Sequence, residues 1–388
     1  MTRRIPVLVA AAMLVLVPVA APAQTGDLIV QKQVFELPTP YKTAGGATIK
    51  GVKIGWEAAG TLNADKSNAI LVTHFFSGTS HAFGKYAASD KSAGYWDAII
   101  GPGKAIDTNK YYVISSDTLV NLNVNSSNVT TTGPASINPD TGKPYGMTFP
   151  VVSIKDFVNV QKQLIDSLGI RRLRAVVGAS MGALQVYEWA ASYPDMVDRI
   201  IPVIGTAGAD PYLVAWLDVW AQPIRLDPKW NGGDYFGREP PLDGLKAALK
   251  IITLHANHWE WARTFGLSAA EDDRAPSSAI SNRFRVEAAL DAAATSRAAI
   301  ADADHLLYLV KANQLASADT SKIKAPALIL YSPTDLVFPP ALVEETAKKI
   351  RDNGTPVETG QLAGPNGHLN GVLAISQAAD RIEAFLGR

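Results

Sequence analysis

The sequence lacks cysteine, an excess of either charge, and any internal repeat or low-complexity tract. Without cysteine, a disulfide framework is excluded. The 36 basic and 36 acidic residues are balanced and form no basic clusters, which argues against nucleic acid or an anionic membrane surface as a partner. What remains is an ordinary globular composition over 388 residues, enough for one large α/β domain with an insertion or for two modest domains.

Residues 1–23 have the pattern of a cleavable signal peptide. Arg3 and Arg4 form a positive first region, Val7–Val19 is the apolar core, and Ala21-Pro22-Ala23 supplies small residues before Gln24. The sequence therefore predicts a mature chain that starts near Gln24 and is periplasmic or secreted. A chain without cysteine also avoids disulfide mispairing in an oxidising compartment.

This segment has two other interpretations. A membrane anchor is disfavoured because the apolar run is short for a span and is interrupted by Pro18. The pair Arg3-Arg4 also suits the twin-arginine export route. Pro6 stands where that signal favours an apolar residue, so the general secretory route is favoured.

Short apolar runs rich in β-branched residues predict an α/β fold with a mostly parallel, doubly wound sheet. The opening strands alternate apolar and polar residues, as half-exposed antiparallel strands do, whereas Ala69–Val72 and Ala175–Val177 are continuously apolar, as buried parallel strands are. A helix is predicted over Ser153–Leu168, with Gly169 as its stop. The predicted strands are Leu28–Leu37, Thr48–Trp56, Ala69–Phe75, Tyr111–Ser116, Arg174–Val177, Arg199–Ile204 and Ala327–Tyr331.

Between residues 208 and 322 the strand pattern gives way to helical sequence. The α/β core is therefore expected to comprise residues 24–207 and 323–388. The insertion follows the sixth strand and is expected to form a helical lid over the carboxyl edge of the sheet, where open α/β folds bind ligands. Its tryptophans either line an apolar pocket or fill the core of the lid itself. They are Trp216, Trp220, Trp230, Trp259 and Trp261.

The segment Val176–Gly182 reads as a strand that enters a G-x-S-x-G turn, followed by an amphipathic helix. This is the context of a nucleophile elbow, in which Gly178 and Gly182 let the helix pass close behind a strained serine. The pattern predicts Ser180 as a nucleophile in an α/β-hydrolase fold. The alternative is an ordinary loop between a strand and a helix.

A serine hydroxyl needs a base at neutral pH, and the base needs an acid to fix its tautomer. In α/β-hydrolases these partners follow the serine in the order acid, then histidine. Asp335 follows the strand Ala327–Tyr331, and His368 lies in a loop before the C-terminal helix. Taken singly, the aspartate is equally a helix cap and the histidine a surface residue. Their order and placement together favour a catalytic triad.

The histidines of the insertion do not predict a metal site. His255 and His258 stand three residues apart on a predicted helix, but no third ligand is near, so we interpret them as helix-surface or pocket-wall residues. His305 is interpreted as structural. No metal and no cofactor are predicted.

An acyl-enzyme mechanism also needs donors for the oxyanion. In this fold one donor is the amide after the nucleophile, here Met181, and the other comes from the loop after the third strand. That loop is His74–His81, in which Gly78 permits a tight turn, and Phe76 is predicted to supply the second amide. The alternative is that Phe75 and Phe76 continue the strand into the core.

Several long segments of the mature chain match one known family. Besides the elbow they are His74–His81, Trp96-Asp97, Ile100–Ala105, Thr132–Pro139, Gly142–Gly146, Asp227–Tyr235, Asp335–Pro340 and Gly367-His368. In these segments the chain resembles the homoserine O-acetyltransferases of the α/β-hydrolase superfamily. The resemblance implies Ser180 as nucleophile, Asp335 and His368 as its partners, and Phe76 and Met181 as oxyanion donors. Members are often dimers, so a homodimer is the implied assembly.

Three departures from the family separate this chain from homoserine. The family has an acidic residue directly after the catalytic histidine, for the substrate amino group, where this chain has Leu369. An arginine that clamps the substrate carboxylate aligns with Ala221, and a turn before Thr132 is replaced by Asn121–Asn128. Each missing charge-assisted contact is worth about 1.5 to 3 kcal/mol. Homoserine is therefore an unfavourable acceptor, and the cytoplasmic donor acetyl-CoA would be absent outside the cell.

These observations predict an exported serine hydrolase that cleaves an ester, or less readily an amide, of a fairly apolar small molecule beneath the lid. An acyltransferase with an acceptor other than homoserine is the first alternative. A catalytically silent periplasmic binding protein is the second, and the complete triad counts against it.

Overall fold

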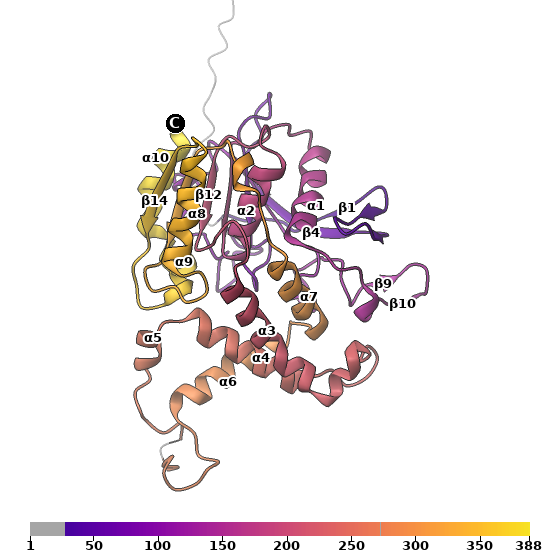
Figure 1. Ribbon diagram of the computed structural model, residues 1–388, viewed down its shortest axis with the longest axis vertical. Coiled ribbons are helices and arrows are strands. Elements are labelled where there is room, and N and C mark those ends of the chain that lie inside the picture. The colour runs from indigo at the N-terminus through magenta and orange to yellow at the C-terminus, as the bar shows by residue number, and fades with distance from the viewer. Residues whose placement is uncertain (1–27, 272) are drawn as a thin grey trace, which may run out of the picture.

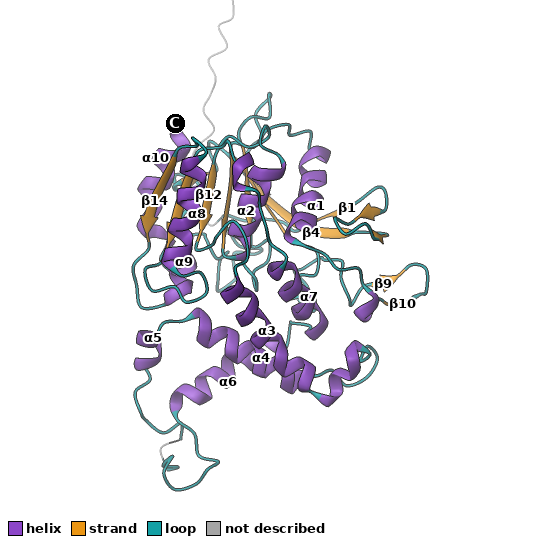
Figure 2. Cartoon of the chain, in the orientation of Figure 1, coloured by secondary structure: helices purple, strands orange, loops and turns teal. Residues whose placement is uncertain are grey.

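The computed structural model describes residues 28–271 and 273–388, so the predicted signal peptide lies outside the described residues. Eight strands form the central sheet in the order β1-β4-β8-β5-β11-β12-β13-β14 (Figures 1 and 2). The pairs β1–β4 and β4–β8 are antiparallel, and the other neighbours are parallel. The strands are β1 (Gln33–Glu36), β4 (Lys53–Ala59), β5 (Ala69–Thr73), β8 (Tyr112–Ser116), β11 (Ala175–Ala179), β12 (Ile200–Val203), β13 (Ala327–Tyr331) and β14 (Val357–Gln361).

The central strands are apolar throughout because both faces of the sheet are covered. In β11 the side chain of Val176 belongs to one hydrophobic core and that of Val177 to the other. The first core lies beneath α1 (Ile154–Ser167), α2 (Met181–Ser192) and α8 (Pro340–Asp352), and the second beneath α10 (Ala379–Gly387) and the loop 82–106. The predicted mostly parallel α/β fold, the helix before β11 and the antiparallel start are confirmed.

The first predicted strands differ from the observed ones in their limits. The predicted strand Thr48–Trp56 is broken, because Gly51 adopts a φ of +63° that a strand does not allow. Only four residues of the predicted strand Leu28–Leu37 form β1, and β14 was not among the predicted strands. Among the described residues, three two-stranded ribbons lie outside the central sheet. They pair β2 (Tyr41–Lys42) with β3 (Thr48–Ile49), β6 (Ile100–Gly101) with β7 (Ile106–Asp107), and β9 (Ile137–Asn138) with β10 (Lys143–Pro144).

Residues 208–322, here called the helical segment, connect β12 to β13. Helix α3 packs on α4 and α7, and α4 packs on α6. Figure 1 shows α3, α4 and α6 beyond one edge of the sheet, on the side where α9 (Asn370–Leu373) lies. Among the described helices, none is both long and apolar enough to cross a membrane. The helices of the segment are α3 (Pro211–Leu226), α4 (Leu242–Ala256), α5 (Trp259–Arg263), α6 (Arg285–Ala298) and α7 (Ala303–Gln314).

Candidate active site

Ser180 stands at the sharp turn between β11 and α2. Its φ of +59° and ψ of −120° are strained for a residue with a Cβ atom, and its N–H donates to the carbonyl oxygen of Val203 at 2.9 Å. A Cβ atom on Gly178 would lie 2.0 Å from Thr73 Oγ1, and one on Gly182 would lie 2.2 Å from the Thr73 carbonyl oxygen. The turn therefore forms only with glycine at both flanking positions.

The structure brings Ser180, His368 and Asp335 together. His368 Nε2 lies 2.8 Å from Ser180 Oγ, and His368 Nδ1 lies 2.8 Å from Asp335 Oδ2. The three residues are nearly covered, with exposed fractions of 7%, 6% and 2%. The serine hydroxyl can donate to one ring nitrogen while the other nitrogen donates to the carboxylate. This is the geometry that a base needs to remove the proton of the hydroxyl.

The Asp335 carboxylate is held from its far side. Its Oδ1 accepts the backbone N–H groups of Val337 at 2.8 Å and Phe338 at 3.0 Å, which leaves Oδ2 for His368. Because a carboxylate oxygen can only accept, Nδ1 of the histidine must carry the proton. Nε2 is then the free base that faces Ser180.

The loop that carries His368 is tied to both the sheet and the helical segment. Asn370 Nδ2 donates to Ser332 Oγ and to the carbonyl oxygen of Gly364, each at 3.0 Å. Gly367 has a φ of +58°, and a Cβ there would lie 2.9 Å from the backbone nitrogen of His258. The backbone after α4 therefore packs directly against the loop that holds the base.

Phe76 and Met181 are the predicted oxyanion donors. Met181 is the first residue of α2, and Phe76 lies in the loop after β5. Within residues 28–271 and 273–388, neither backbone N–H group has a protein acceptor. The Phe76 ring is itself buried and meets the edge of Trp220, with ring centroids 5.5 Å apart. Phe76 thus combines a core side chain with an unpaired amide.

A buried carboxylate, Asp117, fixes the loop that follows Phe76. Its Oδ1 accepts the backbone N–H of Ser80 at 2.8 Å, and its Oδ2 accepts that of Thr130 at 3.0 Å. Lys32 Nζ lies 3.1 Å from the same Oδ2. A carboxylate can accept all three bonds at once. The charge of Lys32 compensates a group that is otherwise fully covered.

Glu57 supports the same loop from β4. It accepts hydrogen bonds from Ser80 Oγ at 2.9 Å and from the Tyr86 hydroxyl at 2.6 Å, and it faces His81 Nδ1 at 3.0 Å. Burial alone would raise the pKa of Glu57, but the hydrogen bond from His81 and the charge of Lys32 hold that pKa below its usual value. Glu57 is therefore charged in the folded protein at neutral pH.

Asn121 joins the loop after β5 to the helical segment. Its Nδ2 lies 3.2 Å from His74 Nε2 and 3.1 Å from the carbonyl oxygen of Gly78. Its backbone carbonyl oxygen accepts from His305 Nδ1 at 2.8 Å. Burial lowers the pKa of both histidines, so each is neutral. The prediction that His305 is structural is consistent with these contacts. No sequence pattern predicts the supporting roles of Asp117, Glu57 and Asn121, which come from separate segments.

The tryptophans of the helical segment divide into two groups. Trp216 and Trp220, on α3, pack against His255, and Trp220 also reaches Phe76. The others lie elsewhere. Trp230 Nε1 donates to Asp304 at 2.9 Å, Trp259 is 56% exposed, and Trp261 packs on Phe265.

His255 and His258 lie in different surroundings. His255 is a buried residue in the last turn of α4, and His258 precedes α5 with its Nδ1 3.4 Å from Glu260. The described residues contain no group of three side chains that could hold a metal ion.

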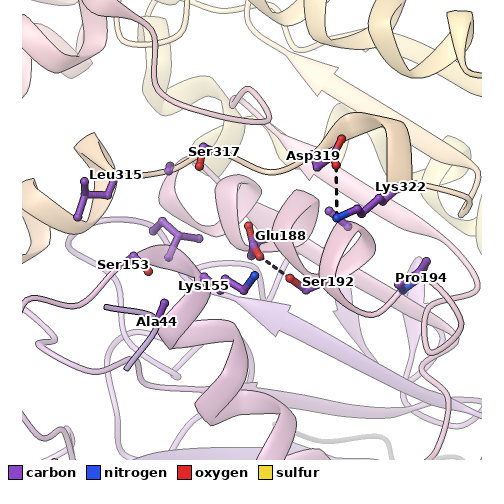
Figure 3. Close-up of a pocket in the computed structure, with 13 residues that line it drawn as sticks. Ala44, Ser153, Lys155, Glu188, Ser192, Pro194, Leu315, Ser317, Asp319 and Lys322 are labelled. Carbon is purple, nitrogen blue, oxygen red and sulfur yellow. Dashed lines mark hydrogen bonds and ion pairs between the residues drawn. The ribbon is translucent and has the colours of Figure 1, made fainter. Parts of the chain in front are cut away.

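A cavity of about 580 Å³ opens on the flank of the core, between α1, α2 and the segment 315–322 (Figure 3). Glu188 and Ser192 face it from α2, joined by a hydrogen bond of 2.5 Å, with Lys155 and Lys322 nearby. Burial raises the pKa of Glu188. No member of the triad lines this cavity. It is therefore separate from the site around Ser180.

Comparison with known proteins agrees with this fold. Residues 127–372 match the family model described as alpha/beta hydrolase fold. A homoserine O-acetyltransferase of Methanosphaerula palustris is 41% identical over 361 residues, which cover 91% of this chain and 72% of that protein. The chain belongs to the homoserine O-acetyltransferase family of α/β hydrolases.

Two solved structures show the same fold. The crystal structure of esterase E22 has a TM-score of 0.88 and 48% identity, covering 92% of this chain and all of that one. A homoserine O-acetyltransferase from Bacillus anthracis has a TM-score of 0.88 and 36% identity, covering 93% of this chain and 98% of that one. Proteins named for hydrolysis and for acetyl transfer therefore share this architecture.

Leu369 and Ala221 are the two positions at which the sequence predicts a departure from the homoserine O-acetyltransferase family. Leu369 directly follows the base and is half-buried. Ala221 is fully buried on α3, next to Trp220. Both positions carry aliphatic side chains, which offer neither a carboxylate nor a guanidinium to an amino acid substrate.

Proposed function

We propose that the protein is a serine hydrolase that cleaves esters of small, fairly apolar molecules through an acyl-enzyme intermediate. The observation that carries the proposal is the relay Ser180–His368–Asp335, with 2.8 Å at both hydrogen bonds. Ser180 Oγ attacks the ester carbonyl carbon while His368 Nε2 takes its proton. The unpaired amides of Phe76 and Met181 stabilise the oxyanion.

The leaving alcohol takes the proton from His368 as the acyl-enzyme forms. A water molecule then gives a proton to His368 and attacks the acyl carbon, and His368 returns this proton to Ser180 Oγ as the acid departs. Asp335 stays ionised and stabilises the imidazolium in both halves of the reaction. Hydrolysis is favoured over transfer to homoserine because Leu369 and Ala221 offer no charged partner to an amino acid.

Inhibition and mutation test the proposed mechanism together. A serine-directed phosphonate should inactivate the purified mature protein and label Ser180. Ser180→Ala should remove both the labelling and the hydrolysis of p-nitrophenyl esters, while the free energy of unfolding stays the same. Undiminished hydrolysis in Ser180→Ala would contradict the mechanism. If the wild-type protein gave no burst with any ester, the silent binding protein would be favoured instead.

Acyl transfer to an alcohol or amine other than water is the second candidate, and membership of the acetyltransferase family favours it. Transfer uses the same acyl-enzyme and differs only in what attacks it. Product analysis in the presence of added alcohols and amines separates the two reactions. If water alone captures the acyl group, transfer is excluded for those acceptors.

We also propose that the protein is exported after cleavage of residues 1–23, and that residues 208–322 act as a lid over the site. The packing of Gly367 against His258 and of Phe76 against Trp220 supports the lid. Mass spectrometry of the protein from a periplasmic or culture fraction should give an N-terminus near Gln24. An intact Met1 in that fraction would contradict cleavage. The homodimer stays a prediction that light scattering tests.

A further inference from the structure

Two polar atoms on the helical segment are buried near the triad without a partner. They are His255 Nδ1 and the Nε1–H group of Trp220, on side chains that are 6% and 5% exposed. Buried polar groups are nearly always paired, because an unpaired one loses its hydrogen bonds to water without replacement. Each of these atoms therefore marks a place where a ligand group would be stabilised.

The hydrogen-bonding role of each atom is fixed. His255 Nε2 lies 3.1 Å from the carbonyl oxygen of Leu336, which can only accept, so Nε2 carries the proton. Burial lowers the pKa of His255 to about 4, so the ring is neutral at pH 7 and Nδ1 presents a lone pair. Trp220 Nε1–H is only a donor. The pair thus offers one acceptor and one donor.

These side chains pack against both halves of the proposed catalytic apparatus. The Trp220 ring meets Phe76, whose amide is the proposed oxyanion donor, at 5.5 Å and 79°. The His255 ring meets Trp220 edge-on at 5.7 Å, and its hydrogen bond to Leu336 ties it to the loop of Asp335. Asp335 and, when it is protonated, His368 are also close enough to influence the pKa of His255.

The chemistry of the pair selects one kind of group. A carboxylate would bring a second acceptor to the His255 lone pair, and an ammonium group has no acceptor for Trp220 Nε1–H. A neutral hydroxyl can accept from Trp220 and donate to His255 at the same time. A hydroxyl is therefore the smallest substituent that complements both atoms.

We propose that His255 and Trp220 form a hydroxyl-binding subsite that makes the protein prefer esters bearing a hydroxyl group. The proposal rests on the proposed hydrolysis for its substrate class. Neither nitrogen is open to solvent, so binding of the hydroxyl requires the two side chains to move. The hydroxyl belongs either to the acyl part or to the alcohol part of the ester.

Two matched pairs of esters distinguish these sources. Ethyl 3-hydroxybutanoate against ethyl butanoate tests the acyl part, and 2-hydroxyethyl butanoate against propyl butanoate tests the alcohol part. In one of the pairs the wild-type protein should have a kcat/KM about tenfold higher for the hydroxylated ester, the effect of one well-placed hydrogen bond in a buried site. No preference in either pair would overturn the proposal and would assign the two atoms to a bound water.

Variants show whether the preference comes from these atoms. Trp220→Phe removes the donor, and His255→Phe removes the acceptor while it keeps an aromatic ring against Trp216. Each variant should abolish the preference because kcat/KM falls for the hydroxylated ester and not for its unsubstituted partner. Trp216→Phe is the matched control, since it changes the stack on His255 without touching either atom, and it should keep the preference. A proportional loss on both esters would show a purely structural role and overturn the proposal.

Binding to the Ser180→Ala variant separates this proposal from the proposed hydrolysis. Calorimetry should show tighter binding of the hydroxylated ester, and His255→Phe in the same background should remove the difference. If binding shows this difference but the wild-type protein cleaves no ester, the proposed hydrolysis is rejected and the proposed subsite is retained. Equal binding of both esters by an active hydrolase would reject the subsite alone.

Discussion

The Thr73 hydroxyl donates a hydrogen bond of 2.9 Å to the carbonyl oxygen of Gly182, and the Thr73 carbonyl oxygen leaves no room for a side chain there. Gly182→Ala should therefore lower the free energy of unfolding by about 2 kcal/mol or more, because the overpacking outweighs the helix propensity gained by alanine. Urea unfolding measures the effect. Gly387→Ala is the control, since that glycine has open space around it. Equal stability of the two variants would contradict the steric argument.

The hydrogen bonds of Asp335 predict the effect of Asp335→Asn. The amide oxygen would keep the N–H groups of Val337 and Phe338, so the NH₂ group would face His368 Nδ1. That nitrogen would then have to accept, and Nε2 would carry the proton and lose its function as base. We expect kcat to fall by about 10³ to 10⁴ with KM nearly unchanged, measured with a p-nitrophenyl ester. A loss below about tenfold would show that the acid is dispensable.

Asp117 predicts an effect on turnover without contact to the substrate. Asp117→Asn can replace only one acceptor oxygen, so either Ser80 or Thr130 loses its partner and the loop after Phe76 is held less firmly. We expect kcat to fall about tenfold or more with little change in KM, because the oxyanion donors act in the transition state. Asp140→Asn, at an exposed ion pair with Lys50, is the control and should leave kcat unchanged. Parallel changes in kcat and KM would point to a general defect.

Asp304 predicts the pH dependence of stability. It is fully buried, burial raises its pKa to about 7, and its Oδ2 has no partner while Oδ1 accepts from Trp230. The unfolded chain releases this proton near pH 4 and the folded protein near pH 7. The stability that the folded protein gains by holding this proton more tightly than the unfolded chain is therefore fully present below pH 4. It is lost as the pH rises to 7.

Asp304→Asn keeps an oxygen for Trp230 and removes the ionisation. It should exceed the wild-type protein in unfolding free energy at pH 8, by on the order of 3 kcal/mol, and by much less at pH 4. Urea unfolding at the two pH values gives the comparison. The same advantage at both values would show that the carboxyl group does not titrate in this range.

Leu369 predicts how the site responds to a new charge. Leu369→Asp places a carboxylate on a half-buried position directly after the base, where it can pair with an amino group. With p-nitrophenyl acetate as donor, capture of the acetyl group by homoserine relative to water should rise about tenfold, the value of one charge-assisted contact. Leu369→Asn is the uncharged control. A rise of the same size in both variants would exclude the charge as the cause.

The parts of the fold that could be predicted from the sequence are those with a strong local signal. Continuous apolar runs such as Ala175–Val177 indicate burial on both faces, and Gly178 and Gly182 around Ser180 mark a turn that tolerates no side chain. The break at Gly51 has a weaker signal, because its positive φ is visible only in the backbone.

The support of the site was not predictable for a different reason. Lys32, Glu57, Asp117 and Asn121 come from four segments, and no spacing rule joins them before the sheet brings β4 and β8 together. The unpaired nitrogen of His255 is likewise a property of its surroundings. The sequence indicated only that His255 stands three residues before His258.

The hydrogen bond between Ser180 and His368 joins residues that are 188 positions apart in the chain. Such a contact closes late in folding, because the intervening strands β12, β13 and β14 must first pair in parallel, and long-range parallel pairing is slow. The hydrolysis regained after dilution from denaturant should therefore lag behind the return of helical circular dichroism. The recovery of enzymatic activity therefore reports when the whole sheet has formed.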